Sequence, residues 1–380
     1  MWGPNAAGKT TLLEAIVLLA LGRSHRTTTD AEMIRWNADF LRIEGLMERV
    51  VVPRPASSPI PQDSVEGSGG EAAVAYEGVV GAVAPGVTLE LTLQAGGRKK
   101  IQVNGVPRRP GVLAEHLRTV LFAPEEMLLV IGPPALRRAA LDGLTAPHDH
   151  GYLADAATYG RALQQRNSLL RAIREGEADP DQLRLWDEPF LASGAAIVTA
   201  RLRLLDLLAE PLAAAHREIA PDEERLTLGY VSNAAPLPGE SPRDALTRRL
   251  RETAEKEAWN GATLIGPHRD DLVFCLGGRD LATFSSRGQQ RTAILALKLA
   301  ELDLLTALDD RPPLLLLDDV FSELDPARRA HLVRRIAELP QALITTTDPN
   351  DIDADLRRRA RAWRVVPDGD GGARVLEGDA

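Results

Sequence analysis

The residues best placed to do chemistry lie within the first eleven positions. Gly3, Gly8, Lys9 and Thr10 match the spacing G-x-x-x-x-G-K-[ST] in full. In such a loop the backbone N–H groups and the N-terminus of the following helix bind phosphates, the lysine reaches the β and γ oxygens, and the hydroxyl ligates Mg²⁺. The alternative is a glycine-rich turn with an exposed lysine. We expect ATP to be bound by Gly3, Pro4, Asn5, Ala6, Ala7, Gly8, Lys9, Thr10 and Thr11.

A second half of the same site is expected near the other end of the chain. Four consecutive leucines at 314–317 run directly into Asp318 and Asp319, which is the Walker B arrangement of an apolar strand ending in carboxylates. A surface acidic pair would not follow such a run. We expect Asp318 to hold Mg²⁺ together with Thr10, and Asp319 to polarise the attacking water, so that Asp319 and Lys9 are the catalytic residues.

Three further segments resemble the motifs of ABC-type ATPases. The segment 285–291 is similar to their signature loop, with Ser286, Gly288 and Gln289 at matching positions before a long apolar helix. A small residue at a helix N-terminus can approach a γ-phosphate closely. After Asp319 the segment 322–325 is similar to the D-loop, in which Asp325 would contact an opposing subunit. The alternative for this segment is that Ser322 caps the helix that starts at Pro326.

The order of these motifs along the chain supports the same interpretation. Thr346 and Thr347 follow in the switch position, so the order is phosphate loop, signature, Walker B, D-loop and switch, as in an ABC head. In such heads the signature loop lies away from its own phosphate loop. Ser286 and Gly288 can therefore serve only the γ-phosphate of a second subunit, and we expect an ATP-dependent homodimer with Asp325 crossing the interface.

The sequence pattern around these motifs predicts an α/β fold. We expect an ABC-type P-loop ATPase head with an inserted, mainly helical second lobe. We expect the head at 1–133 and 261–380 and the helical lobe at 134–260, with a flexible insertion at about 53–86 rich in Pro, Ser and Gly. Alternation at 88–93 and 100–103 around Asn104-Gly105 predicts a small antiparallel sheet. Apolar runs at 271–276, 314–317 and 342–345 predict a parallel sheet. The Gly- and Asp-rich last dozen residues are expected to fray.

Composition narrows the class of protein. The chain has 380 residues, one cysteine and a net charge of −9, and no apolar stretch reaches the ~18 residues that a membrane span needs. We therefore expect a cytoplasmic protein with no membrane association, no disulfide and no zinc site. The net negative charge confines any DNA contact to local basic patches. The candidate patches are 98–100 with 108–109, 137–138, and 248–251.

Other stretches resemble the RecF family of bacterial recombination-repair ATPases. They are 22–27 with 33–35, 122–127, 134–142, 165–170, the block Gly266-Pro267-His268-Arg269-Asp270-Asp271-Leu272, and 284–301. The resemblance runs over most of the chain, and the block at 266–272 is its most specific part. The roles of His268, Arg269, Asp270 and Asp271 stay open between a buried polar turn that braces the signature loop and a direct contact with nucleotide or DNA.

The resemblance implies an activity that the residues by themselves do not show. It implies ATP-dependent DNA binding at single-/double-strand junctions and gaps, slow DNA-stimulated ATP hydrolysis, and cooperation with RecR and RecO in loading RecA during DNA replication, recombination, repair and the SOS response. Another SMC-like repair ATPase, or a truncated module that binds DNA or RecR without hydrolysis, is the alternative. RecF-like heads begin with one or two strands before the phosphate loop, so we expect this chain to be N-terminally incomplete and poorly soluble.

Overall fold

The computed structural model describes residues 1–27, 29–50, 83–146, 149, 151–309, 312–369 and 372–378. Most of the expected insertion at 53–86 lies outside these residues. The described residues pack into two compact units, Ala15–His116 and Met1–Glu14 with Leu117–Ala380. The domain boundaries expected from the sequence stay a prediction. Within the described residues, no helix is both long enough and apolar enough to cross a membrane.

The unit at Ala15–His116 is built on a four-stranded antiparallel sheet. Leu89, Leu91 and Leu93 alternate along its second strand and are fully or almost fully buried, while Gly45 leaves room for Leu19, whose Cδ1 lies 2.7 Å from where a Cβ would stand. The antiparallel hairpin expected around Asn104-Gly105 is confirmed, and both turn residues have positive φ. The elements are α1 (Lys9–Leu21), η1 (Asp30–Met33), β1 (Phe40–Val50), β2 (Val83–Gln94), β3 (Lys100–Val103), β4 (Val106–Pro107), η2 (Pro110–Val112) and α2 (Leu113–His116).

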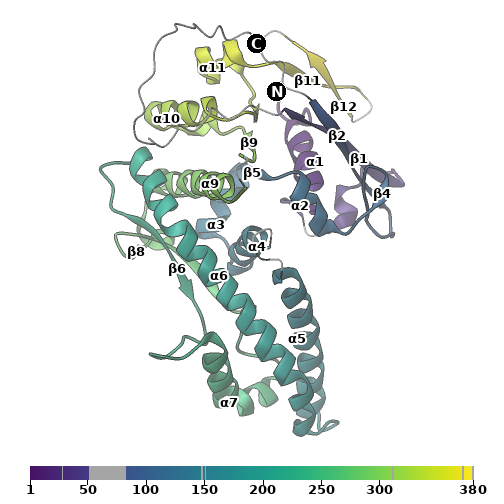
Figure 1. Ribbon diagram of the computed structural model, residues 1–380, viewed down its shortest axis with the longest axis vertical. Coiled ribbons are helices and arrows are strands. Elements are labelled where there is room, and N and C mark those ends of the chain that lie inside the picture. Colours follow the sequence, from purple (N-terminus) through teal and green to yellow (C-terminus); the bar gives the residue numbers. More distant parts are fainter. Residues whose placement is uncertain are drawn as a thin grey trace, which may run out of the picture. The chain divides into compact units, whose positions relative to one another are not determined.

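The other unit carries the parallel sheet that positions the chemistry. Its strands lie in the order β10-β9-β5, where β5 is Thr119–Phe122, β9 is Leu314–Asp318 and β10 is Ala342–Thr345. The leucine run at 315–317 is at most 1% exposed, because helix α9 (Arg287–Asp309) and helix α10 (Pro326–Ala337) share one core with this sheet (Figure 1). The parallel pairing expected for the runs at 314–317 and 342–345 is therefore confirmed.

The third apolar run, at 271–276, was wrongly expected in the parallel sheet. It forms β7 (Asp271–Leu276), which pairs antiparallel with β6 (Leu226–Val231) and β8 (Arg279–Asp280). Only Leu272 and Phe274 of β7 are buried, so the strand alternates as a half-covered antiparallel strand does. The sequence interpretation also missed β6, although Leu226, Leu228 and Tyr230 alternate with smaller residues.

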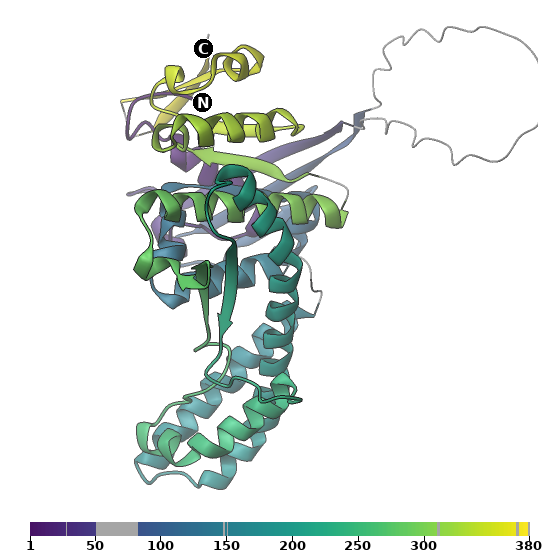
Figure 2. The same cartoon turned by 90° about the vertical axis from the view of Figure 1, so that its left-hand side faces the viewer.

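Long helices fill the segment expected to be a helical lobe. The 36-residue helix α6 (Arg184–Ile219) packs against α5 (Tyr152–Arg174), α7 (Pro242–Asn260) and α9, so one helix joins the lobe to the sheet region (Figure 2). Tyr159 and Phe190 stack in the core of this lobe. The shorter elements between β5 and β9 are η3 (Pro124–Met127), α3 (Leu128–Ile131), α4 (Pro134–Thr145), η4 (Pro180–Leu183) and α8 (Leu281–Phe284).

The C-terminal residues form a hairpin, in contrast to the fraying expected from their composition. Strand β11 (Trp363–Pro367) pairs antiparallel with β12 (Ala373–Glu377). Trp2 makes parallel bridges to Thr346 on one side and to Arg364 on the other. The first residues therefore lie between β10 and β11 in the same unit, with the N-terminus beside the hairpin. The remaining elements are η5 (Phe321–Glu323), η6 (Pro349–Asp351) and α11 (Ala354–Arg359).

Candidate nucleotide site

The two residues before the phosphate loop are held by backbone hydrogen bonds on both sides, to β11 and to Thr346, which follows β10. Trp2 N–H donates to Trp363 O at 2.9 Å, and Val365 N–H donates to Trp2 O at 2.8 Å. On the other side Thr346 N–H donates to Met1 O at 3.1 Å. A Cβ on Gly3 would lie 2.2 Å from Val365 O, so this position must be glycine for the loop to leave beside β11.

The loop has the backbone that its motif requires. Ala6 and Gly8 have positive φ, 62° and 97°, and the helix begins at Lys9. The Lys9 side chain is 7% exposed, and its Nζ donates to Gly3 O at 2.8 Å and Pro4 O at 3.0 Å. The ammonium is thus held over the loop by two carbonyls. Pro4, Asn5, Ala6 and Thr11 are exposed, and Ala7 is buried.

The two halves of the site, which lie 308 residues apart in the sequence, meet through Thr10 and Asp318. Thr10 Oγ1 donates to Asp318 Oδ2 at 2.7 Å, and Thr345 Oγ1 donates to Asp318 Oδ1 at 2.5 Å. Asp318 is 5% exposed. Its neighbour Asp319 has a φ of 51°, which is uncommon for a non-glycine residue, and its N–H donates to Thr345.

The signature segment forms a reciprocal cap at the start of α9. Gln289 N–H donates to Ser286 Oγ at 3.2 Å, and Ser286 N–H donates to Gln289 Oε1 at 3.0 Å. Ser286 is exposed. A Cβ on Gly288 would meet only Ser286 Oγ, at 3.7 Å, among the described residues. The N-terminus of the helix is therefore open to a ligand or a partner.

The D-loop and switch residues occupy defined hydrogen-bonding positions. Asp325, not Ser322, caps α10, because its side chain accepts from the backbone N–H groups of Ala327 and Arg328, both at 3.0 Å. Ser322 Oγ instead donates to Asp319 O at 2.8 Å. In the switch segment Thr346 is buried and its Oγ1 donates to Asp348 O, while Thr347 is half-buried.

Known proteins match this chain over almost its full length. It is 38% identical to the DNA replication and repair protein RecF of Symbiobacterium thermophilum over 381 residues, which cover 97% of this chain and 92% of the relative. It is 37% identical to the protein of the same name from Geobacillus thermodenitrificans over 370 residues, 96% of this chain and 90% of the relative. The chain belongs to the RecF family.

Solved structures agree with this family. Two of them, described as the recombination mediator protein RecF in the RecFOR pathway with ATPrS and with ATP, superpose with TM-scores of 0.79 and 0.80 at 30% identity. Both cover 99% of this chain, and this chain covers 91% and 90% of theirs. They confirm the expected ABC-type ATPase head with a long helical insertion. The chain matches no protein-family model.

This RecF-family chain presents an oxygen pair that fits Mg²⁺. A hydroxyl and a carboxylate, Thr10 Oγ1 and Asp318 Oδ2, lie 2.7 Å apart, and oxygen donors of these types are the ones that Mg²⁺ takes from proteins while it keeps several waters or phosphate oxygens. Among the described residues no group of three or more His, Cys, Asp or Glu side chains is arranged to hold a metal. Two protein ligands are enough for a metal that arrives with a nucleotide.

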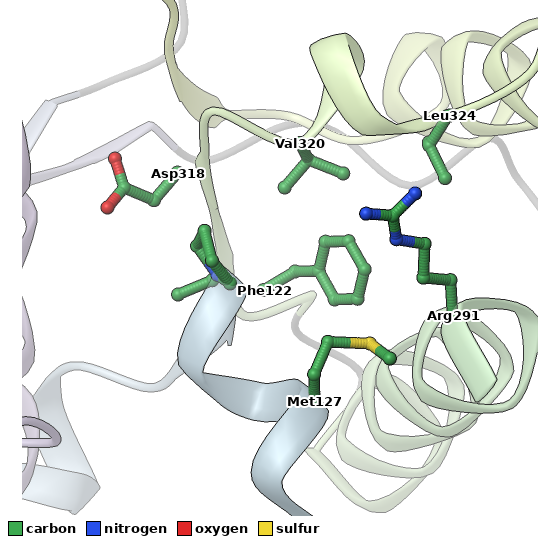
Figure 3. A pocket seen from close by; sticks show the side chains of 8 residues that line it. Phe122, Met127, Arg291, Asp318, Val320 and Leu324 are labelled. Atoms are coloured by element: carbon green, nitrogen blue, oxygen red, sulfur yellow. The ribbon is translucent and has the colours of Figure 1, made fainter. Parts of the chain in front are cut away.

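Two features of this site were not assigned from the sequence. One is Thr345, the residue before the two assigned switch threonines, which contacts both Asp318 and Asp319. The other is a pocket at the end of β5 and β9, into which the Arg291 side chain reaches from α9 toward Phe122 and Val320 (Figure 3). The motif 122–127 could have predicted the pocket. Strand β5 runs parallel to β9 and ends beside Asp318, so the residues after β5 must lie at the same edge of the sheet.

A buried ion cluster, which the sequence interpretation also missed, ties the same region to the signature helix. Lys298 on α9 lies 2.5 Å from a Glu126 oxygen and 3.2 Å from a Glu301 oxygen. Burial opposes the charge on Lys298, but the two carboxylates outweigh it and raise the pKa of its ammonium; burial also raises the pKa of Glu301. The cluster fixes η3 against α9.

The block at 266–271 is a polar turn in which Asp270 is buried and Arg269 is exposed, with Arg269 Nε donating to Thr263 O at 3.0 Å. Asp270 is 1% exposed and accepts from Tyr230 Oη at 2.7 Å, Ser232 Oγ at 3.0 Å and Asn233 N–H at 3.2 Å. His268 Nδ1 lies 2.6 Å from Tyr159 Oη, and burial lowers the pKa of His268 to about 4. These contacts tie the turn to α5 and β6. Contacts of the described residues do not brace the signature loop, as one interpretation expected them to do.

Arginines of the helical lobe complete the same network. Arg137 forms a two-pronged ion pair with Asp271, at 2.8 and 2.7 Å. Arg201, which is 4% exposed, donates to Pro267 O at 2.9 Å and to Asp142 at 2.7 Å. The polar groups of the most specific family block are therefore bonded to the lobe around it.

Proposed function

We propose that this RecF-family chain binds ATP with Mg²⁺ at the loop Gly3–Thr11 and hydrolyses it slowly, as a dimer. The observation that carries the proposal is the 2.7 Å hydrogen bond between Thr10 and Asp318, because it joins the phosphate-binding and metal-binding halves of the site. The solved relatives bound to ATPrS and ATP support it. Membership of the RecF family does not depend on this hydrogen bond.

The residues have distinct roles in this proposal. Lys9 exchanges its bonds with Gly3 O and Pro4 O for β and γ oxygens of ATP, which are stronger acceptors because they are charged. Thr10 and Asp318 would hold Mg²⁺, which would supply positive charge to the phosphates. Asp319 orients a water whose oxygen attacks the γ-phosphorus as the bond to the β–γ bridging oxygen breaks, giving ADP and phosphate. Its side chain is shorter than glutamate, so turnover should be slow.

The proposed partner in this site is a second copy of the chain. Ser286 uses its oxygen as an acceptor in the cap, which leaves its hydroxyl proton to donate to a phosphate. Gly288 leaves space beside it, and the first amides of the 23-residue helix α9 point the same way. ATP contacted by Ser286, Gly288 and Gln289 of one copy and Lys9 of the other stabilises the dimer by mass action. Asp325 is exposed at the start of α10 and would cross the interface, and Thr346 and Thr347 would act as the switch.

In the cell we propose the function that the family implies. The chain acts in the cytoplasm as a recombination mediator that binds DNA at single-/double-strand junctions and gaps, with DNA stimulating hydrolysis, and works with RecR and RecO to load RecA. The relatives' names, DNA replication and repair protein and recombination mediator in the RecFOR pathway, support this part. If purified protein binds ATP but releases no ADP with or without gapped DNA, the chain is a binding module instead.

Two measurements test the nucleotide site and the dimer separately. Lys9→Ala should weaken ATP binding roughly a hundredfold, about 2.7 kcal/mol, by removing charge-assisted bonds to the phosphates. The exposed Lys256→Ala is the control and should bind normally. Unchanged ATP affinity in Lys9→Ala would refute the phosphate-loop assignment.

For the dimer, sedimentation is measured with a non-hydrolysable ATP analogue. Wild type should dimerise, and Ser286→Arg should bind ATP as a monomer, because the larger side chain fills the space beside Gly288. Ser241→Arg is a matched control, since Ser241 forms the same kind of capping box on α7 in the helical lobe. A wild-type monomer at saturating analogue would contradict the shared site.

A further inference from the structure

An arginine-rich segment beside the phosphate loop is not among the basic patches that were named from the sequence as candidate DNA contacts. It comprises α11, β11 and β12 and carries Arg357, Arg358, Arg359, Arg361, Arg364 and Arg374, which we name the arginine surface. Five of the six are exposed, and Arg357 is half-buried. The chain has a net charge of −9, so six arginines within 18 residues are a strong local departure.

In the first of the three patches expected from the sequence Lys99 donates to Gly22 O and Asp30, while Arg98, Lys100, Arg108 and Arg109 are exposed. The other two patches are largely committed to internal contacts. Arg137 is buried against Asp271, and Arg138 donates to Asp270 O. In the third patch Arg248 pairs with Glu240 and Glu252, and Arg249 pairs with Glu252 and donates to Asn233 O. These groups cannot reach a phosphate without giving up their present partners.

Among the described residues the arginine surface makes only exposed ion pairs, and Arg357 donates to Pro349 O at 3.3 Å and to Asn350 Oδ1 at 2.9 Å. Arg359 and Arg374 make no ion pair with any of the residues that the structure describes. Arg358 pairs with Asp355 and Arg361 with Glu377, but both pairs are about 70% exposed and exchange readily for other anions. The six-residue helix α11 ends in three arginines. Their total charge is larger than the partial negative charge at the C-terminus of a helix.

Two of these arginines stack on tryptophans. The Arg364 guanidinium lies 5.0 Å from the Trp2 ring centre, and the Arg361 guanidinium lies 5.5 Å from that of Trp363. Stacking on an aromatic face fixes the guanidinium plane and leaves its N–H edges to donate. Because Arg374 pairs with Val366 across the hairpin, Arg374 and Arg364 project from the same face, diagonally adjacent.

The same hairpin contacts both glycines of the phosphate loop. A Cβ on Gly3 would lie 2.2 Å from Val365 O of β11, and a Cβ on Gly8 would lie 3.1 Å from the Ala373 Cβ of β12. Trp2 hydrogen-bonds to β11 on both sides of Arg364. A change in the loop on ATP binding must therefore be accommodated by the strands that carry Arg364 and Arg374.

We propose that the arginine surface binds the phosphate backbone of DNA and that the hairpin couples this binding to the phosphate loop. The proposal rests on the DNA- and ATP-binding function above and locates the DNA contact. Charge favours a polyanion as the occupant, and planar donors suit phosphate oxygens. An acidic protein segment is the alternative occupant and is an outcome of the test.

The first experiment measures binding of fluorescein-labelled gapped DNA by the full chain at several salt concentrations with saturating ATP analogue. In the variant Arg358→Gln, Arg359→Gln, Arg374→Gln we expect DNA affinity to fall by about tenfold or more at 0.15 M salt. The slope of log affinity against log salt should drop by up to about 0.9 for each arginine that contacts a phosphate. The control Arg248→Gln, Arg249→Gln, Arg251→Gln removes the same charge and should stay within about twofold of wild type.

The outcomes separate this proposal from the proposed function. Wild-type DNA binding with an unchanged affinity and slope in the arginine-surface variant overturns the proposal alone and points to an acidic protein partner. No DNA binding by wild type overturns both. Circular dichroism and ATP affinity of the same preparations exclude misfolding as the cause of a loss.

The second experiment tests the coupling. If ATP raises the affinity for DNA by some factor, DNA must raise the affinity for ATP by the same factor. In Arg364→Gln, which lacks the stack on Trp2, this factor should fall at least threefold while ATP affinity without DNA stays near normal. An unchanged factor in Arg364→Gln overturns the coupling.

Discussion

Two polar regions of this chain, one at the end of the parallel sheet and one in the helical lobe, look alike in sequence. They differ in whether their polar groups have hydrogen-bond partners within the protein. At the end of the parallel sheet, Ala6 and Asp319 have positive φ, a conformation that costs about 1–2 kcal/mol for a residue with a side chain. Several neighbouring loop residues are exposed. In the helical lobe, by contrast, Asp270 accepts three hydrogen bonds and is 1% exposed. Backbone strain and exposure therefore go with the proposed nucleotide site, whereas satisfied hydrogen bonds go with the region that holds the fold.

The largest expected effect falls on the helical lobe. Arg166 is 2% exposed and bonds Asp187, Thr263 and Glu257, the last of which is 1% exposed. Arg166→Met should lower the free energy of unfolding by about 3–5 kcal/mol, because it leaves a buried carboxylate without its partner. Arg184→Met removes an exposed ion pair and should change stability by less than about 0.5 kcal/mol. Denaturant unfolding measures both; equal small effects would contradict the structural role of this network.

The next effect falls on the sheet edge. Asp319→Asn should reduce turnover about a hundredfold or more while ATP binding is preserved, because the amide cannot accept the water proton as a carboxylate does. ADP release and binding of a fluorescent ATP analogue, measured together, separate the two effects. Asp181→Asn, an exposed carboxylate in the helical lobe, is the control. If Asp319→Asn instead abolishes ATP binding, Asp319 has a structural role and the contrast between the regions weakens.

A smaller effect tests the residue that sequence reasoning missed. Thr345→Val keeps the shape of the side chain but removes the hydroxyl that donates to Asp318 and accepts from Asp319 N–H. Asp319 N–H keeps Thr345 O as an acceptor, so the main loss is the bond to Asp318, about 1–1.5 kcal/mol, which should lower Mg²⁺-dependent turnover roughly fivefold to tenfold. Thr306→Val removes a hydroxyl that bonds only Leu302 O within α9 and should leave turnover unchanged. Equal rates in the two variants would remove Thr345 from the site.

The last expected effect is on the pH dependence of stability. Burial lowers the pKa of His268 to about 4, below its ordinary value near 6.5. Between these values the unfolded chain binds the proton that the folded chain refuses, so stability falls as pH falls from about 6.5 to 4. His268→Asn keeps an acceptor for Tyr159 but cannot titrate, and it should lose less stability than wild type between pH 7 and 5. Parallel loss in both proteins would show that His268 is not buried as described.

The sequence by itself determined the ordered motifs, from the phosphate loop to the switch, and the leucine run of β9. These features are local: a loop that binds phosphate needs glycines at set positions, and a strand covered on both faces must be continuously apolar. Spacing could also place Ser286 and Gln289 on one helix turn, where they form the cap. Such patterns depend on neighbours a few residues apart, so they can be predicted without the fold.

Only the tertiary structure decided which polar groups meet. It paired Thr345 with Asp318 and Glu126 with Lys298, moved the strand at 271–276 into an antiparallel sheet, and placed the arginine surface beside Trp2. These contacts join residues up to hundreds of positions apart. Which of many exposed arginines or buried carboxylates becomes a neighbour depends on how the helices and strands pack, and no periodicity along the chain encodes that choice.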